Sequence, residues 1–176
     1  MERTSSKVVY EGPIATVRVD EFRYDDGSTA EREVVGHPGA VAVLAHDDDT
    51  LYLVRQPREA VAEAALLELP AGKLDVPGES RLDCARRELA EEIGKQADDW
   101  RELKRFYISP GFADEEVTLF LAGGVRDAEH DPDAAERIEI VAWPLSELDG
   151  AIAECRDAKS LVGLLVLKEM RRAGGA

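Results

Sequence analysis

Glu79, Glu88, Glu91 and Glu92 accompany Arg87 in one short segment, residues 69–95, which reads LPAGKLDVPGESRLDCARRELAEEIGK. Carboxylates are hard oxygen ligands, and a group of them without Cys or His favours Mg²⁺ or Mn²⁺. Ordinary i,i+4 charge pairing, such as Arg87 with Glu91, is the plain alternative. The spacing therefore has to be judged against the element that carries it.

That element is a predicted helix from about Ser80 to Ile93, and Gly94 is a plausible stop. At about 100° per residue, Glu88 and Glu92 border its apolar stripe instead of facing water. The stripe consists of Leu82, Ala85, Leu89 and Ile93. A carboxylate at a core boundary is costly unless it is paired or metal-bound, so the position favours a ligand role.

Short strand-like segments precede and follow this helix. Before it they are 7–12, 15–24, 31–37, two strands within 40–56, and 65–70; after it they are 103–109, 116–124 and 137–144. Residues 25–28, DDGS, predict a hairpin turn. Helical spacing returns at 145–155 and 159–172. This order predicts an α/β or α+β sandwich in which helices cover a mixed β-sheet.

The amino-acid composition limits the classes of molecule that the protein is expected to bind. The formal net charge is −15, with 37 acids against 22 bases. Such a surface repels phosphate backbones and anionic lipids, so we expect neither nucleic-acid nor membrane binding. The two cysteines, Cys84 and Cys155, form no metal spacing and no disulfide framework. With no signal-peptide pattern at the start, we expect a cytoplasmic protein.

The segment resembles the Nudix hydrolase box, G-x5-E-x7-R-E-U-x-E-E-x-G-U, where U is apolar. Gly72, Glu79, Arg87–Glu88–Leu89, Glu91–Glu92 and Gly94 match it in order. Six residues instead of five separate Gly72 from Glu79, and Lys95 occupies the last apolar position. The resemblance implies a Nudix-type α/β/α sandwich and hydrolysis of a nucleoside diphosphate linked to another group.

The resemblance also implies roles. Glu88 and Glu92 are expected to hold Mg²⁺ or Mn²⁺, Glu91 to complete a second ion site, and the Ala71 carbonyl to add a ligand. Glu79 is expected to orient the loop and metal-bound waters. Arg87 is expected to pair with a carboxylate of the box and fix its rotamer.

Features outside the box suggest a subgroup. Pro110 and Gly111 lie in the sequence SPGF, and Pro110 stands fifteen residues after Lys95. This placement resembles the ADP-ribose pyrophosphatases, as do ELPAGKLD before the helix and GFADEEVTLFLA after it. A plain turn is the alternative explanation of the Pro-Gly pair.

Other charged residues are candidates for binding the substrate. Arg55 and Arg58 follow a strand and could grip a diphosphate, although exposed surface arginines would have the same pattern. Arg32 and Glu33 resemble adenine-contacting positions of the subgroup. Glu115 is expected to border the ribose or a metal.

The general base is expected in the acidic segment AEHDPDAAERIE, because related enzymes often take it from a loop after the box. Glu136 is the first choice, with Asp133 and Glu139 as alternatives. A solvated acidic loop would account for the same composition.

We therefore expect an N-terminal strand region at 1–38, which the resemblance implies forms a homodimer, and a Nudix hydrolase domain at 39–176. The expected reaction converts ADP-ribose to AMP and ribose 5-phosphate. Two alternatives stay open: a pyrophosphatase for another nucleoside diphosphate sugar, such as GDP-mannose, and a module that senses ADP-ribose without cleaving it.

Overall fold

The computed structural model describes residues 1–128 and 137–174. The chain forms two compact units. Unit 1 contains Met1–Gly39 and Phe106–Glu116, and unit 2 contains Ala40–Arg105 and Val117–Ala176. The expected division at 38/39 into a dimerisation region and a hydrolase domain stays a prediction. The segment 106–116, which the sequence analysis assigned to the remainder of the chain, packs within unit 1.

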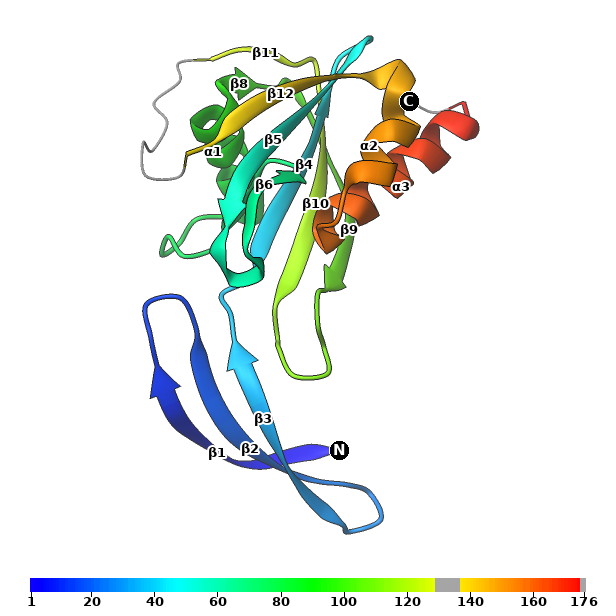
Figure 1. Cartoon of the computed structure of the whole chain (residues 1–176). Coiled ribbons are helices and arrows are strands. Elements are labelled where there is room, and N and C mark those ends of the chain that lie inside the picture. The colour runs from blue at the N-terminus through cyan, green and yellow to red at the C-terminus, as the bar shows by residue number, and fades with distance from the viewer. Residues whose placement is uncertain (129–136, 175–176) are drawn as a thin grey trace. The chain divides into compact units, whose positions relative to one another are not determined.

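Unit 1 is built on an antiparallel sheet of three strands in the order β1-β2-β3 (Figure 1). The strands are β1 (Glu2–Glu11), β2 (Thr16–Arg23) and β3 (Thr29–Gly36). The predicted turn connects β2 to β3, where Gly27 has a φ of 84°, a conformation that glycine adopts without a Cβ clash. Segment 106–116 adds a bridge to β3, because Val35 N donates to Phe112 O at 2.8 Å and Asp114 N donates to Val35 O at 3.2 Å.

Unit 2 contains a mixed sheet in the order β12-β5-β4-β10-β9, with β6 paired to β5 and β7 paired to β4. Its strands are β4 (Ala40–His46), β5 (Thr50–Arg58), β6 (Glu63–Glu68), β7 (Ala71–Lys73), β9 (Asp99–Tyr107), β10 (Glu116–Gly123) and β12 (Glu139–Pro144). β10 runs parallel to β4, while β5 and β7 run antiparallel to it. The predicted mixed sheet is confirmed.

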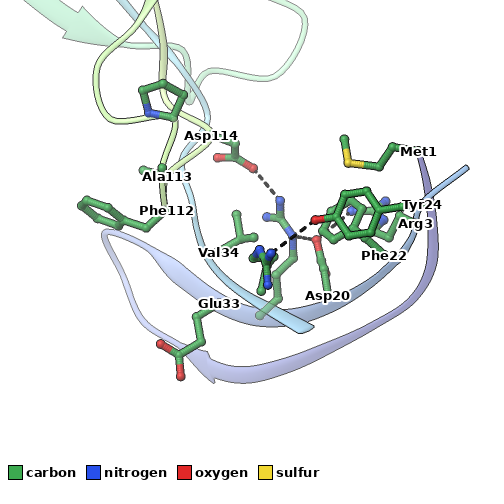
Figure 2. A pocket seen from close by; sticks show the side chains of 14 residues that line it. Met1, Arg3, Asp20, Phe22, Tyr24, Glu33, Val34, Phe112, Ala113 and Asp114 are labelled. Atoms are coloured by element: carbon green, nitrogen blue, oxygen red, sulfur yellow. Dashed lines mark hydrogen bonds and ion pairs between the residues drawn. The ribbon is translucent and has the colours of Figure 1, made fainter. Parts of the chain in front are cut away.

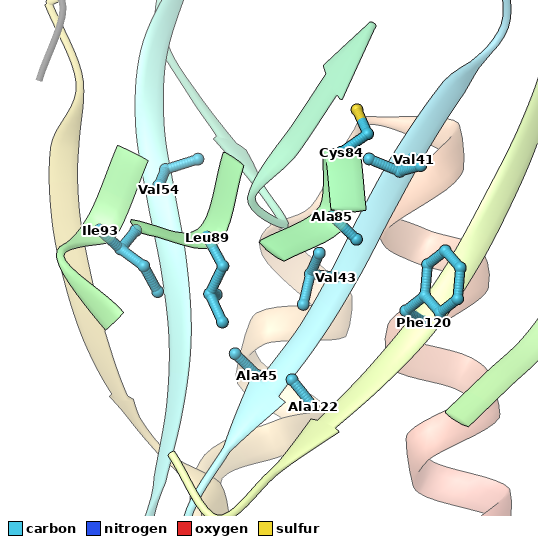
Figure 3. Close-up of a cluster of buried hydrophobic side chains, with 10 residues drawn as sticks. All are labelled: Val41, Val43, Ala45, Val54, Cys84, Ala85, Leu89, Ile93, Phe120 and Ala122. Atoms are coloured by element: carbon cyan, nitrogen blue, oxygen red, sulfur yellow. The ribbon is translucent and has the colours of Figure 1, made fainter. Parts of the chain in front are cut away.

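Helices cover both faces of this sheet. They are α1 (Arg81–Ile93), α2 (Leu148–Glu154) and α3 (Ala158–Arg172), with short 3₁₀ turns η1 (Glu59–Val61) and η2 (Leu145–Glu147). Val41, Val43 and Ala45 of β4 pack with α1 in one core cluster (Figure 3). On the other face, a Cβ at Gly163 of α3 would lie 2.5 Å from Leu69 Cδ1 and 3.5 Å from Leu44 Cγ. The two cores follow from strand alternation, which gives the α/β/α sandwich.

A two-stranded sheet of β8 (Lys95–Gln96) and β11 (Arg126–Asp127) follows α1. Lys95, which departs from the Nudix pattern, places its ammonium 4.8 Å from the centre of the Tyr52 ring and 2.6 Å from Asp127 Oδ1. Its stem and charge thus have partners where the pattern expects an apolar side chain. Among the described residues, no helix has the length and apolarity needed to span a bilayer.

Candidate metal and substrate site

Helix α1 begins and ends where its capping residues require. The Ser80 hydroxyl accepts a hydrogen bond from Asp83 N at 3.1 Å, which satisfies a backbone donor of the first turn. Gly94 ends the helix with a φ of 62° and donates to the Ala90 carbonyl at 3.0 Å. These caps fix the two ends of the helix that carries Glu88, Glu91 and Glu92.

Glu92 lies at the end of the helix that meets β7. Only 5% of the residue is exposed, and its Oε2 accepts a hydrogen bond from Ala71 N at 3.0 Å. A buried carboxylate requires such partners, because desolvation of its charge is costly. The bond fixes Glu92 against the strand whose carbonyl, at Ala71, was predicted to bind metal.

Glu88 lies against Gly72, one residue further along β7. A Cβ at Gly72 would stand 1.8 Å from Glu88 Cδ and 2.3 Å from Glu88 Cγ. No side chain fits there unless Glu88 moves, so the absence of a side chain at Gly72 lets the carboxylate approach the backbone. Glu88 and Glu92 therefore both face the Ala71–Gly72 backbone, as their spacing of four residues allows.

Arg87 donates hydrogen bonds to three carboxylates in the same region. Its Nε and Nη2 donate to the two oxygens of Glu79 at 2.9 and 3.0 Å. Its Nη1 donates to Glu88 at 2.8 Å and to Glu91 at 2.9 Å. Hydrogen bonds from Arg87 hold the pKa of Glu79 below its ordinary value. The hydrogen bond to Glu79, and then those to Glu91 and Glu88, raise the pKa of Arg87. The guanidinium thus fixes the rotamers of three carboxylates.

These residues fit a hard divalent cation by their chemistry. Four carboxylates gather around the Ala71–Gly72 backbone and Arg87, and oxygen is the donor that Mg²⁺ and Mn²⁺ prefer. Within residues 1–128 and 137–174, no three acidic, His or Cys side chains already form a metal-binding group. Both carboxylate oxygens of Glu79, and one each of Glu88 and Glu91, accept from Arg87 instead. The ligand set therefore stays a prediction.

Cys84 lies beside this group but has the properties of a core residue. It is fully buried in the cluster under α1, and its thiol is 3.4 Å from the Lys73 carbonyl (Figure 3). Burial raises the pKa of the Cys84 thiol to about 12, so it stays protonated near neutral pH. A protonated thiol is a poor metal ligand.

Four of the predicted substrate residues line one cavity of unit 1, with a volume of about 560 Å³ (Figure 2). They are Arg32, Glu33, Pro110 and Gly111. Aromatic side chains of Phe22, Tyr24 and Phe112 line it as well. Arg32 Nη2 donates to the Tyr24 hydroxyl at 3.3 Å. The combination of aromatic surface with charged groups suits a flat heteroaromatic ring.

An ion network centred on the buried carboxylate of Asp20 forms another part of the cavity wall. Arg18 donates to Asp20 and to Asp114, each at 2.9 Å (Figure 2). Ser6 also donates to Asp20, at 2.5 Å. Burial alone would raise the pKa of Asp20, but the hydrogen bonds from Ser6, Arg18 and Arg3 outweigh it and lower the pKa. The network fixes Asp20 in its charged form. Glu33 points away from Asp20 and Asp114 (Figure 2).

The remaining predicted substrate residues have other partners. Arg55 pairs with Glu154 at 2.5 Å. Arg58 donates from Nε and Nη2 to Glu68 at 2.6 and 2.8 Å. Glu115 belongs to unit 1, where its carboxylate lies 4.0 Å from His37 Nδ1, and it is not among the cavity-lining residues. Their contacts with substrate stay predictions.

The predicted base, Glu136, and its alternative Asp133 lie outside the described residues. The second alternative, Glu139, begins β12 and is exposed. It stands opposite Arg55 in the antiparallel pair of β12 with β5. The choice among the three stays a prediction.

Sequence reasoning missed a group of charged and polar side chains around Glu68, which lies just before the box. Glu68 is fully buried at the end of β6, where it pairs with Arg58 and with Lys159 of α3. Asp157, the N-cap of α3, and Ser160 in its first turn extend the same group. One signal was present in the sequence: an acid within the apolar run ALLELP indicates a carboxylate that needs buried partners.

Comparison with known proteins places this geometry in a family. A sequence model of the NUDIX domain matches residues 36–160, which include all four glutamates, Arg87 and Gly72. This chain belongs to the Nudix family. A second model, the nucleoside diphosphate sugar hydrolase N-terminal domain, matches residues 1–35 of the Nudix chain.

Individual relatives agree with this membership. An ADP-ribose pyrophosphatase of Bacillus subtilis is 37% identical over 180 residues, covering 98% of this chain and 96% of the relative. One from Mycobacterium tuberculosis is 44% identical over 127 residues, 72% of this chain but only 61% of that relative. A GDP-mannose pyrophosphatase of Yersinia enterocolitica is 32% identical, with 78% of each chain covered. A solved ADP compounds hydrolase superposes with a TM-score of 0.85 at 24% identity, over 99% of this chain and 95% of the other, which supports the fold.

Proposed function

We propose that this Nudix protein hydrolyses the diphosphate bond of ADP-ribose, giving AMP and ribose 5-phosphate. The observation that carries the proposal is the meeting of Glu88 and Glu92 at the Ala71–Gly72 backbone, next to the Arg87 pairs with Glu79 and Glu91. The Nudix family generally uses divalent metal ions, and here Mg²⁺ or Mn²⁺ is proposed.

The proposed reaction adds water across a phosphoanhydride. The water oxygen forms a bond to one phosphorus, the bridging P–O bond breaks, and the departing phosphate takes the bridging oxygen. A bound divalent ion would neutralise the phosphate oxygens and lower the pKa of water. Ala71 N–H would orient Glu92, and Arg87, which donates to Glu79, Glu88 and Glu91, would fix the rotamers of these three carboxylates.

The preference for adenine rests on unit 1. Pro110 and Gly111, the residues that suggested the subgroup, line the same cavity as Arg32 and Glu33. The aromatic side chains of Phe22, Tyr24 and Phe112 offer stacking surface for a base. The presence of ADP-ribose pyrophosphatases among the relatives, at 37% and 44% identity, supports the same substrate.

A panel of substrates tests the proposal. Purified protein is incubated with ADP-ribose, ADP-glucose, GDP-mannose or ATP, in Mg²⁺, Mn²⁺ or excess EDTA, and nucleotide release is measured by chromatography. We expect ADP-ribose to give the highest kcat/KM and EDTA to abolish turnover. The Glu92→Gln variant keeps the shape of the side chain but loses its charge, so it should fold and lose most activity.

Each other outcome has a separate meaning. Preference for GDP-mannose would reject ADP-ribose and keep the hydrolase. Tight ADP-ribose binding without AMP release would support the sensing module. Full turnover in EDTA, or near-normal kcat in Glu92→Gln, would reject the metal site.

A further inference from the structure

Glu68 occupies an unusual position for a carboxylate. Its side chain is completely inaccessible to solvent, yet it lies only three residues before Ala71. Arg58 donates two hydrogen bonds to it, and Lys159 donates a third at 2.5 Å. A buried carboxylate with this many charge-assisted bonds is strongly fixed in position, since breaking any one would leave a charge unpaired.

Lys159 connects this carboxylate to the start of α3. Its ammonium also pairs with Asp157 Oδ2 at 2.9 Å. Asp157 caps α3 by accepting from Ser160 N at 2.9 Å and from the Ser160 hydroxyl at 2.6 Å. The Ser160 hydroxyl oxygen in turn accepts from Leu69 N at 2.8 Å. The network thus ends at the backbone of Leu69, the residue that follows Glu68.

The five residues 68–72 each have a partner on another element. Glu68 contacts β5 and α3, and Leu69 contacts α3. The Pro70 carbonyl accepts from Val43 N of β4 at 2.9 Å. Ala71 N donates to Glu92 of α1, and Gly72 lies against Glu88 of α1. One end of this short segment is thus held by the ion network, and the other end meets the predicted metal-binding carboxylates.

We infer that Glu68 is a positioning residue for the metal site, acting through residues 69–72 on the Ala71 backbone and Glu92. This inference rests on the proposed function, because it assigns Glu68 a task toward the metal proposed there. Arg58 then serves as the partner that orients Glu68. Replacing a residue that orients metal ligands without touching the metal commonly changes metal affinity by about 10–100-fold.

Mn²⁺ binding tests the inference without relying on turnover. Apparent Kd is measured by titration calorimetry or by the loss of the free Mn²⁺ EPR signal, for wild type, Glu68→Gln and Ser160→Ala. We expect Glu68→Gln to weaken Mn²⁺ binding about 10–100-fold. Ser160→Ala removes the bond to Leu69 and keeps every charge, so we expect a smaller loss in the same direction.

Two matched controls test whether loss of a negative charge, or loss of stability, would by itself weaken Mn²⁺ binding. Glu63→Gln removes a charge from the same strand, where Glu63 pairs with Arg156 at the surface. Leu167→Ala makes a cavity in the buried face of α3, which should lower Tm measured in EDTA. Both controls should keep wild-type Mn²⁺ affinity.

The outcomes distinguish the two proposals. If wild type binds Mn²⁺ and both Glu68→Gln and Ser160→Ala bind it equally well, the positioning role is wrong and the metal site stands. If Leu167→Ala loses affinity as Glu68→Gln does, the effect is general destabilisation, which also rejects the role. If wild type binds no Mn²⁺, the proposed metal site fails and the inference with it. Should Glu68→Gln not fold, Ser160→Ala decides.

Discussion

Gly72 allows a prediction from a single missing side chain. A Cβ there would stand 1.8 Å from Glu88 Cδ, so Gly72→Ala must displace the Glu88 carboxylate. Because that carboxylate is the mobile end of a side chain, we expect the fold to survive. Activity should fall on the order of 10–100-fold, as for residues that orient metal ligands. The measurement is kcat/KM at saturating Mg²⁺ together with Tm.

Gly123→Ala is the matched control, because a Cβ at Gly123 would meet only Asp99 Cβ, at an ordinary 3.6 Å. It should keep both activity and Tm. If Gly72→Ala retains wild-type kcat/KM, Glu88 does not need its place against the strand.

The identity of the general base is a second question at the residue scale. We expect Glu136→Gln to lower kcat about 10²–10⁴-fold with little change in KM, because a base acts in the transition state. Asp133→Asn and Glu139→Gln are measured beside it. If Glu136→Gln is the mildest of the three variants, the choice of Glu136 is wrong.

At the scale of elements, the cap of α3 predicts a pH dependence of stability. Burial alone would raise the pKa of Asp157, but Lys159 and the hydrogen bonds from Ser160 outweigh it and lower the pKa. A carboxyl whose pKa is lower in the folded state stabilises the fold above its unfolded pKa, about 3.9. That stabilisation is lost as the pH falls through the folded-state pKa.

Asp157→Asn isolates this charge, because Asn also caps helices well. We expect the variant to lose about 1–3 kcal/mol of unfolding free energy near pH 7, where a charge-assisted bond is removed. The difference from wild type should shrink below about pH 4. Denaturant unfolding at several pH values measures it. A difference that is the same at pH 3 and pH 7 would contradict the assignment.

Local signals made some elements predictable. The limits of α1 were visible because Ser80 and Gly94 are capping residues next to a 3.6-residue apolar pattern. β7 has only the three residues Ala71–Lys73, too few to show an alternation, and β8 and β11 are shorter still. β9 begins at Asp99, before the apolar run that suggested a start at 103, because polar residues join a strand when a neighbour supplies its hydrogen bonds.

The residues of the candidate site were also predictable only where a local sequence pattern marks them. The acids of α1 could be placed on a face by helical periodicity, so Glu88 and Glu92 were found. Glu68 was missed because its partners, Arg58 and Lys159, are 10 and 91 residues away in sequence. The contact of segment 106–116 with β3 is also long-range in sequence and left no local pattern. Long-range packing decides such contacts, and a single sequence does not record it.

At the scale of the whole molecule, β1 supports the expected homodimer. All ten of its residues are exposed, and it forms one edge of its sheet. Val8, Val9 and Tyr10 are 56%, 54% and 59% exposed. The pairing of β1 with β2 is irregular between Val8 and Tyr10, and the three side chains together leave apolar surface uncovered. Edge strands of this kind are usually covered by another element or chain.

We therefore expect light scattering after size exclusion to give twice the 19.3 kDa mass of one chain at micromolar concentration. Val9→Lys should raise the dimer Kd tenfold or more, because burying an ammonium against apolar groups costs at least about 1–3 kcal/mol. Leu165→Lys is the matched control, since Leu165 is a 48% exposed apolar residue of α3 in unit 2. A wild-type monomer would reject the dimer. Dissociation by Leu165→Lys but not by Val9→Lys would move the interface from β1 to α3.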